Sequence, residues 1–132
     1  MNIDASTVLS ELFERYESKP TADEWWPGDA DVARWTDGAM AAEYTLLNEV
    51  AAELARGYAA GRYSYEFGDG VANGLWAVLI NGQSRPGAAE QPWPSLFNDV
   101  YDAFDGGEYR LAAEDPIETR TKPWIAEIVA KL

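Results

Sequence analysis

Carboxylates and aromatic rings come together at one place in the chain, the start of its most apolar long segment. Glu66 and Asp69 are three residues apart and Asn73 follows four residues later, so at helical period the three share one face. Tyr63 and Tyr65 directly precede them. Carboxylates at this spacing suit a hard cation such as Mg²⁺ or the basic side chains of a protein partner, and tyrosines are rigid anchors for such a partner.

Further acidic and aromatic residues extend this candidate site. Asp102 and Asp105 lie on the polar flank of a later predicted helix and would border the same surface if the two helices are neighbours. Trp25 and Trp26 form a pair in a stretch without helical period. A tryptophan pair in a loop either closes the edge of the core or serves as an exposed anchor, because Trp is common at binding hot spots.

The residue types that are missing restrict the chemistry. The chain has no histidine and no cysteine, which excludes serine–histidine and cysteine–histidine mechanisms, zinc–thiolate sites and disulfides. An enzyme with this sequence would depend on carboxylates with a cation such as Mg²⁺, or on Tyr, Lys or Arg.

The charge balance points to a class of partner. The formal net charge is −13, from 23 acidic and 10 basic residues. Such a field repels nucleic acid and anionic membrane surfaces and attracts a basic protein; the alternative is that it only maintains solubility. No segment has the apolar length of a membrane span, and the first residues lack the basic start of a signal peptide. We therefore expect a cytoplasmic protein with a basic protein partner and no nucleic-acid or membrane partner; the sequence leaves its oligomeric state open.

Helical periodicity dominates the chain and predicts a single all-α domain over residues 1–132, a compact bundle of about five helices. The predicted helices span residues 5–17, 39–60, 65–81, 94–105 and 123–131. A short helix through Val32 and Trp35, capped by Asp29 or Asp31, is a further candidate. The expected core consists of Leu12, Phe13, Leu47, Leu54, Phe67, Leu75, Leu79, Phe97, Val100 and Ile128.

Local signals predict how these helices begin and pack. Asp4 or Ser6 is expected to cap the first helix, and Asp37 the second long helix. Gly70 and Gly74 are four residues apart beside the apolar stripe of the central helix. This spacing predicts that another helix approaches closely there.

One interpretation of the carboxylates is a metal site. Glu49 and Glu53 lie on one predicted helix, and Glu66-Phe-Gly-Asp69 begins the next. This arrangement resembles the all-α nucleoside triphosphate pyrophosphohydrolases, in which a Glu-x-x-Glu pair and a Glu-x-x-Asp on the following helix bind magnesium beside the triphosphate. The resemblance implies magnesium-dependent hydrolysis with these four residues as ligands. The first pair departs from the family pattern, because Glu49 and Glu53 are one residue further apart.

The interpretation that we favour is a binding protein without a catalytic residue, metal or cofactor. Residues 101–109, the Trp25–Trp26 region and the tyrosine-rich start of the central helix resemble small acidic bacterial toxin-immunity proteins. That resemblance implies an inhibitor of a basic toxin or enzyme, whose acidic helical surface takes the place of the phosphates that a nuclease binds. The predicted partner-binding residues are Tyr63, Tyr65, Glu66, Asp69, Asp102, Asp105, Trp25 and Trp26.

Overall fold

A computed structural model describes residues 3–18, 24–108 and 115–132 and confirms the all-α class. Its six α-helices are α1 (Ala5–Glu17), α2 (Asp29–Thr36), α3 (Met40–Ala59), α4 (Tyr65–Asn81), α5 (Ser95–Asp105) and α6 (Lys122–Ala130). Over these ranges there is no β-strand, and no helix has the length and apolar character needed to cross a membrane. The five predicted helices agree with the observed ones to within one residue at each end. Tyr109, the last residue of the segment that resembles immunity proteins, lies outside the described residues.

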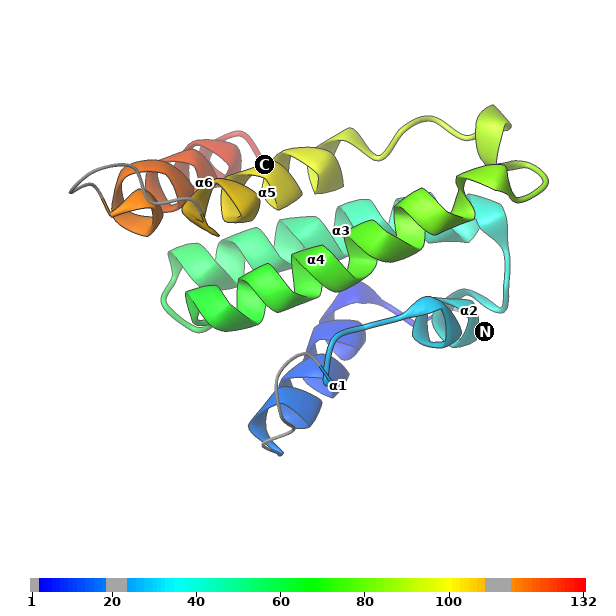
Figure 1. The fold of residues 1–132 in the computed structure, drawn as a ribbon, viewed down its shortest axis with the longest axis horizontal. Coiled ribbons are helices and arrows are strands. Elements are labelled where there is room, and N and C mark those ends of the chain that lie inside the picture. Colours follow the sequence, from blue (N-terminus) through cyan, green and yellow to red (C-terminus); the bar gives the residue numbers. More distant parts are fainter. Residues whose placement is uncertain (1–2, 19–23, 109–114) are drawn as a thin grey trace.

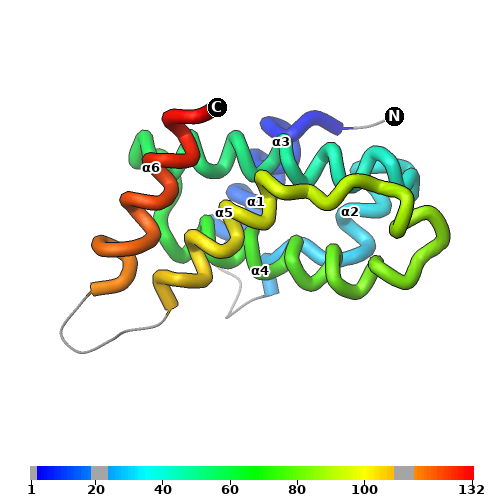
Figure 2. Tube along the Cα trace, turned by 90° about the horizontal axis from the view of Figure 1, so that it is seen from above, coloured from blue at the N-terminus to red at the C-terminus, as the bar shows by residue number. Residues whose placement is uncertain are grey.

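The α3–α4 hairpin is the central layer of the fold (Figure 1). The two helices run antiparallel and are joined by a tight turn at which Gly61 has a φ of +81°, a conformation that favours glycine. In both views α5 and α6 lie next to each other over one face of the hairpin, and α1 lies on the opposite face (Figure 2). The molecule is therefore layered, with α3 and α4 buried between helices on both sides.

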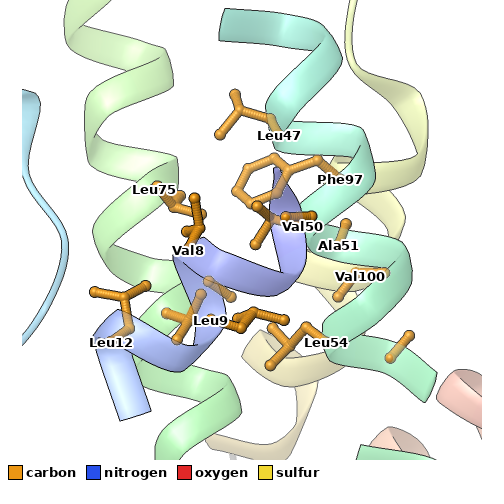
Figure 3. Packing of buried hydrophobic residues seen from close by; sticks show 14 of the residues in the cluster. Val8, Leu9, Leu12, Leu47, Val50, Ala51, Leu54, Leu75, Phe97 and Val100 are labelled. Atoms are coloured by element: carbon orange, nitrogen blue, oxygen red, sulfur yellow. The ribbon is translucent and has the colours of Figure 1, made fainter. Parts of the chain in front are cut away.

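The core forms where α1, α3, α4 and α5 meet (Figure 3). Val8 from α1, Val50 from α3 and Leu75 from α4 point toward one another and are almost completely buried. All predicted core residues are buried except Phe13, which is half-buried. Phe13 lies at the edge of the core, with its ring edge-on to Phe67 at a centroid distance of 5.2 Å.

Two predicted details of the central helices are wrong. The segment that approaches Gly70 and Gly74 is the non-helical turn around Trp25 and Pro27, rather than a helix. A Cβ at Gly70 would overlap the Trp25 ring, and one at Gly74 would lie 2.6 Å from the Pro27 carbonyl oxygen. Asp37 does not cap α3: it ends α2 with a φ of 53°, and α3 starts three residues further on, at Met40, after Ala39 at the N-cap position.

The helix ends and short elements follow local chemistry. Asp4 caps α1 as predicted, since its Oδ1 accepts a hydrogen bond from the Thr7 N–H at 2.8 Å. Residues 117–121 show no period in the sequence but form a π-helical turn that continues into α6. There the Thr121 hydroxyl donates to the Ala103 carbonyl oxygen at 2.6 Å, which fastens the start of α6 to α5.

An ion network joins α1 to α2. The guanidinium of Arg15 donates to both carboxylate oxygens of Asp31 at 3.0 Å, and Arg34 reaches Glu11 at 2.6 Å. Trp35 Nε1 also donates to Glu11, at 3.3 Å. Each carboxylate of this α1–α2 network thus lies against at least one arginine.

Candidate functional site

The surface edge shared by α4 and α5 carries the most unusual set of side chains in the described part of the chain, and we call it the acidic strip. It includes most of the polar row predicted on the central helix, and the residues that face that row from α5. The acidic strip consists of Asp69, Asn73, Trp76, Trp93, Asn98, Tyr101, Asp102, Asp105 and Glu108.

Local structure explains how the acidic end of the strip is assembled. The Ser64 hydroxyl caps α4 by accepting a hydrogen bond from the Phe67 N–H at 3.1 Å, which fixes the register that places Asp69 on the α5 side. After α5 the chain continues as a 3₁₀ turn, η3 (Gly106–Glu108). A Cβ on Gly107 would lie 2.5 Å from Thr121 Oγ1, so a glycine lets this turn pack closely and brings Glu108 beside Asp69.

Burial and neighbouring acids raise the pKa of three aspartates in the strip. Burial, followed by the negative charge of Glu108 and then that of Asp105, raises the pKa of Asp69 to about 7. Burial and Glu108 likewise raise the pKa of Asp105, and burial and Asp99 raise that of Asp102. The buried Oδ1 of Asp69 has no hydrogen-bond partner among the described residues. In the isolated protein, burial and the neighbouring acids therefore disfavour the charged forms of these aspartates.

Aromatic rings form the other end of the strip. Trp76 and Tyr101 stack with a centroid distance of 4.2 Å and an interplanar angle of 6°, and Trp93 meets Trp76 edge-on. The Trp93 indole N–H donates to Asn98 Oδ1 at 3.0 Å, and Asn98 Nδ2 donates to Asp102 at 2.9 Å. A hydrogen-bonded chain thus connects the aromatic end to the carboxylates, while Trp93 remains 39% exposed.

The structure separates the predicted binding residues into groups. Asp69, Asp102 and Asp105 lie on the acidic strip, because α4 and α5 are neighbours. Tyr65 lies at the end of the strip, half-buried, with its hydroxyl donating to the Phe104 carbonyl oxygen at 2.6 Å. Tyr63 points elsewhere: it packs against Phe67 and lines a cavity beside the α3–α4 turn.

The remaining three predicted residues differ in accessibility. Glu66 is exposed on the first turn of α4. Trp25 is only 2% exposed and stacks on Phe67 at 5.4 Å, so its predicted role as a surface anchor is wrong and the core-closing alternative is correct. Trp26 is half-buried with its indole nitrogen next to Gly70.

The carboxylates expected to bind magnesium do not converge. Glu53 pairs with Arg56 at 2.9 Å, whereas Glu49 borders a separate cavity with Trp35. Asp69 faces the acidic strip. Nowhere in residues 3–18, 24–108 and 115–132 do three acidic side chains form a group that could hold a metal ion. The residues present therefore do not fit the magnesium site that the pyrophosphohydrolase resemblance implies.

Sequence reasoning missed several members of the strip. Glu108 follows two glycines that predict the end of a helix, so helical period could not place it beside α4. Trp93 lies between two prolines in a segment with the composition of a loop. The spacing of Asn98 and Asp102, four residues apart on the predicted helix, was an available signal for their hydrogen bond.

No protein-family model, curated protein or solved structure matches this chain. The chemistry of its own residues must therefore indicate its role. Crowded carboxylates beside stacked aromatic rings, with no metal-binding group in the described residues, are suited to holding a cationic side chain.

Proposed function

We propose that this protein is an acidic protein-binding module, an immunity-type inhibitor that neutralises a basic toxin or enzyme by binding it through the acidic strip. The observation that carries the proposal is the crowding of Asp69, Asp105 and Glu108, which raises the pKa of Asp69 to about 7. A positive charge from a partner would offset the repulsion among these carboxylates and favour their ionised forms.

A guanidinium group is the cation that best fits this end of the strip. Arginine is weakly hydrated and stays charged when partly buried, and its planar fork matches carboxylate oxygens. The exposed carboxylate of Glu108 and the half-buried one of Asp105 offer such a group acceptors beside Asp69. Binding therefore converts a repulsive cluster into a set of charge-assisted hydrogen bonds.

The aromatic end of the strip supplies the apolar part of a binding hot spot. Trp76 and Tyr101 are held rigidly by their stacking, so little side-chain entropy remains to be lost on binding. Trp93 and Ile80 are among the few large apolar side chains that are substantially exposed in the described structure, at 39% and 41%. Rigid aromatic anchors beside charged groups are typical of the centres of protein interfaces.

The remaining charge of the molecule favours rapid encounter with a basic partner. The net charge of −13 attracts a positively charged protein over distances of about 10 Å at 0.1 M salt. An inhibitor that must reach a toxin before its target does gains directly from such steering.

The proposal is tested by neutralisation. The protein is produced together with the basic, toxin-like product of a gene next to its own, and cell growth and formation of a purified complex are measured. We expect the wild type to protect the cells and to form a stoichiometric complex. Failure to protect or to bind would contradict the proposal.

A matched pair of variants separates a specific site from general acidity. Asp69→Asn/Asp105→Asn removes two carboxyl groups from the strip, whereas Glu14→Gln/Glu49→Gln removes two from exposed positions on α1 and α3. We expect only the first pair to lose affinity substantially. Equal losses would show that the net charge, rather than the acidic strip, is responsible for binding.

A further inference from the structure

An open apolar groove, which shares no residue with the acidic strip, runs along α6 beside the start of α5. We call it the α6 groove, and its volume is about 340 Å³. Trp124, Ile128 and Leu132 follow one another at intervals of four residues, so they share one side of α6 and of the turn that ends it. Leu96 and Asp99 of α5 line the opposite side of the groove.

The α6 groove exposes apolar side chains that the core does not use. Ile125 and Ile128 are the buried residues that join α6 to the core. Four large apolar side chains are substantially exposed in the described structure, and two of them, Trp124 and Leu132, line this groove, at 39% and 45%. No aromatic ring among the described residues packs against Trp124. The groove therefore presents apolar area that this chain leaves uncovered.

The charge of this part of the chain differs from that of the rest. Residues 115–132 contain three acidic and three basic residues, so their formal charge is zero. The whole net charge of −13 therefore comes from residues 1–114. Two copies of the chain repel each other in most orientations, and the repulsion is weakest where their α6 helices meet. A strongly basic protein, by contrast, is attracted to the acidic faces.

The rim of the groove carries charges of both signs, which makes the surface complementary to itself. Lys131 Nζ lies 3.8 Å from Glu127 Oε1, and both side chains are largely exposed. Such a pair contributes little within one chain, so either member can exchange its partner at low cost. An antiparallel pairing of two α6 helices about a two-fold axis brings Lys131 of each copy toward Glu127 of the other. The same pairing brings Trp124 of each copy toward Leu132 of the other.

We propose that the α6 groove is the interface of a homodimer and that a second copy of this chain occupies it. The Trp124 ring of each copy fills the groove of the other, and Lys131 and Glu127 exchange partners across the two-fold axis. An edge of one short helix buries less area than a standard interface, so the dimer is weak and reversible, with a dissociation constant in the micromolar range. This interface does not depend on the acidic strip being a binding surface.

Sedimentation equilibrium of the purified chain at low and high salt tests the proposal. We expect a monomer–dimer equilibrium that shifts toward the dimer as salt is added, because salt screens the repulsion between two copies that each carry a charge of −13. Binding of a basic protein to the acidic strip should weaken under the same change, so the two proposals predict opposite effects of salt. A monomer at both salt concentrations, up to about 500 μM protein, overturns the proposal.

Two equally exposed tryptophans provide a matched pair of variants. Trp124→Ala is expected to weaken the dimer at least tenfold, because truncating an aromatic anchor at the centre of an interface typically has a large effect. Trp93→Ala, on the acidic strip, removes a side chain of the same 39% exposure and should leave the dimer unchanged. If folded Trp124→Ala dimerises like the wild type, or weakens only the complex with a basic partner, the groove does not hold a second copy and the proposal fails.

Exchanging charges tests the two-fold arrangement itself. Glu127→Lys and Lys131→Glu each place like charges opposite one another in a homodimer, so each variant alone should dimerise more weakly than the wild type. In an equal mixture of the two variants, both contacts of the mixed dimer again join opposite charges. We therefore expect the mixture to recover the affinity of the wild type. If the mixture dimerises no better than the separate variants, the proposal is overturned.

Discussion

On the α1–α2 side of the molecule, the carboxylates of Glu11 and Asp31 lie against arginines, whereas Asp69 and Asp105 in the acidic strip lie beside another carboxylate. Hydrogen bonds from Arg34 are the main cause of the lowered pKa of Glu11. Burial works against Asp31, but hydrogen bonds from Arg15 and from the Gly28 N–H still lower its pKa. In the strip Asp69 and Asp105 instead have a raised pKa.

The difference shows which carboxylates help to hold the fold together and which lie beside other acids. In the α1–α2 network each negative charge is balanced within the chain, and the ion pairs connect two helices. In the acidic strip burial and neighbouring acids are the main influences, and no pair of them connects elements by attraction. A protein with 23 acidic residues thus uses them in two opposite ways.

The largest expected effect comes from a residue that carries no charge. Leu75 is 1% exposed in the core beneath both regions, so Leu75→Ala should lower the free energy of unfolding by about 2–5 kcal/mol. The loss should be nearly the same at pH 4 and pH 8, because no titrating group is removed. Urea unfolding at both pH values provides this uncharged reference, and a loss below about 1 kcal/mol would mean that α4 does not pack as described.

Breaking the balanced network is expected to cost less and to depend on pH. Arg15→Met removes the guanidinium that holds Asp31 and should lower stability by about 1–2 kcal/mol at pH 7. Because the folded pKa values of Glu11 and Asp31 are depressed, their contribution is present above the ordinary carboxyl pKa of about 4 and is lost as the pH falls through the folded values. Arg56→Met, which removes only an exposed pair with Glu53, serves as the control.

Removing a charge from the acidic strip is expected to stabilise the protein. The raised pKa of Asp69 favours the folded state below about pH 4, and this advantage is lost as the pH rises through about 7. Asp69→Asn should therefore be more stable than the wild type by about 1 kcal/mol at pH 8, allowing for solvent screening, with the gain disappearing near pH 4. Thermal unfolding across this pH range measures it. If Asp69→Asn instead destabilises the protein at pH 8, the charged form of Asp69 stabilises the fold, as those of Glu11 and Asp31 do.

The smallest expected effect concerns the rate of association with the basic partner. Asp102 is only partly buried, so Asp102→Asn should slow association about two- to threefold at low salt and barely change dissociation. Stopped-flow measurements at low and high ionic strength distinguish the two rates, with Glu14→Gln as the control. If dissociation changes more than association, Asp102 belongs to the centre of the interface.

The sequence predicts most of this fold because the long helices are amphipathic and have clear ends. α2 is harder to predict, since eight residues give only two turns of pattern, and the π-helical turn before α6 has no period at all. Of the candidate sites, the proximity of Asp69 to Asp105 could be anticipated from two helix flanks. The positions of Glu49 and Trp25 could not, because spacing places residues on one face of an element without showing what that face meets.

With a pKa of about 7, Asp69 is close to half-titrated at neutral pH. The count of charges in the sequence therefore overstates the charge that this face carries in the isolated protein. An approaching cation expels the remaining proton, so the surface becomes more negative in response to what it meets. The heat of binding would then include the heat of the buffer that takes up this proton and would change with the choice of buffer.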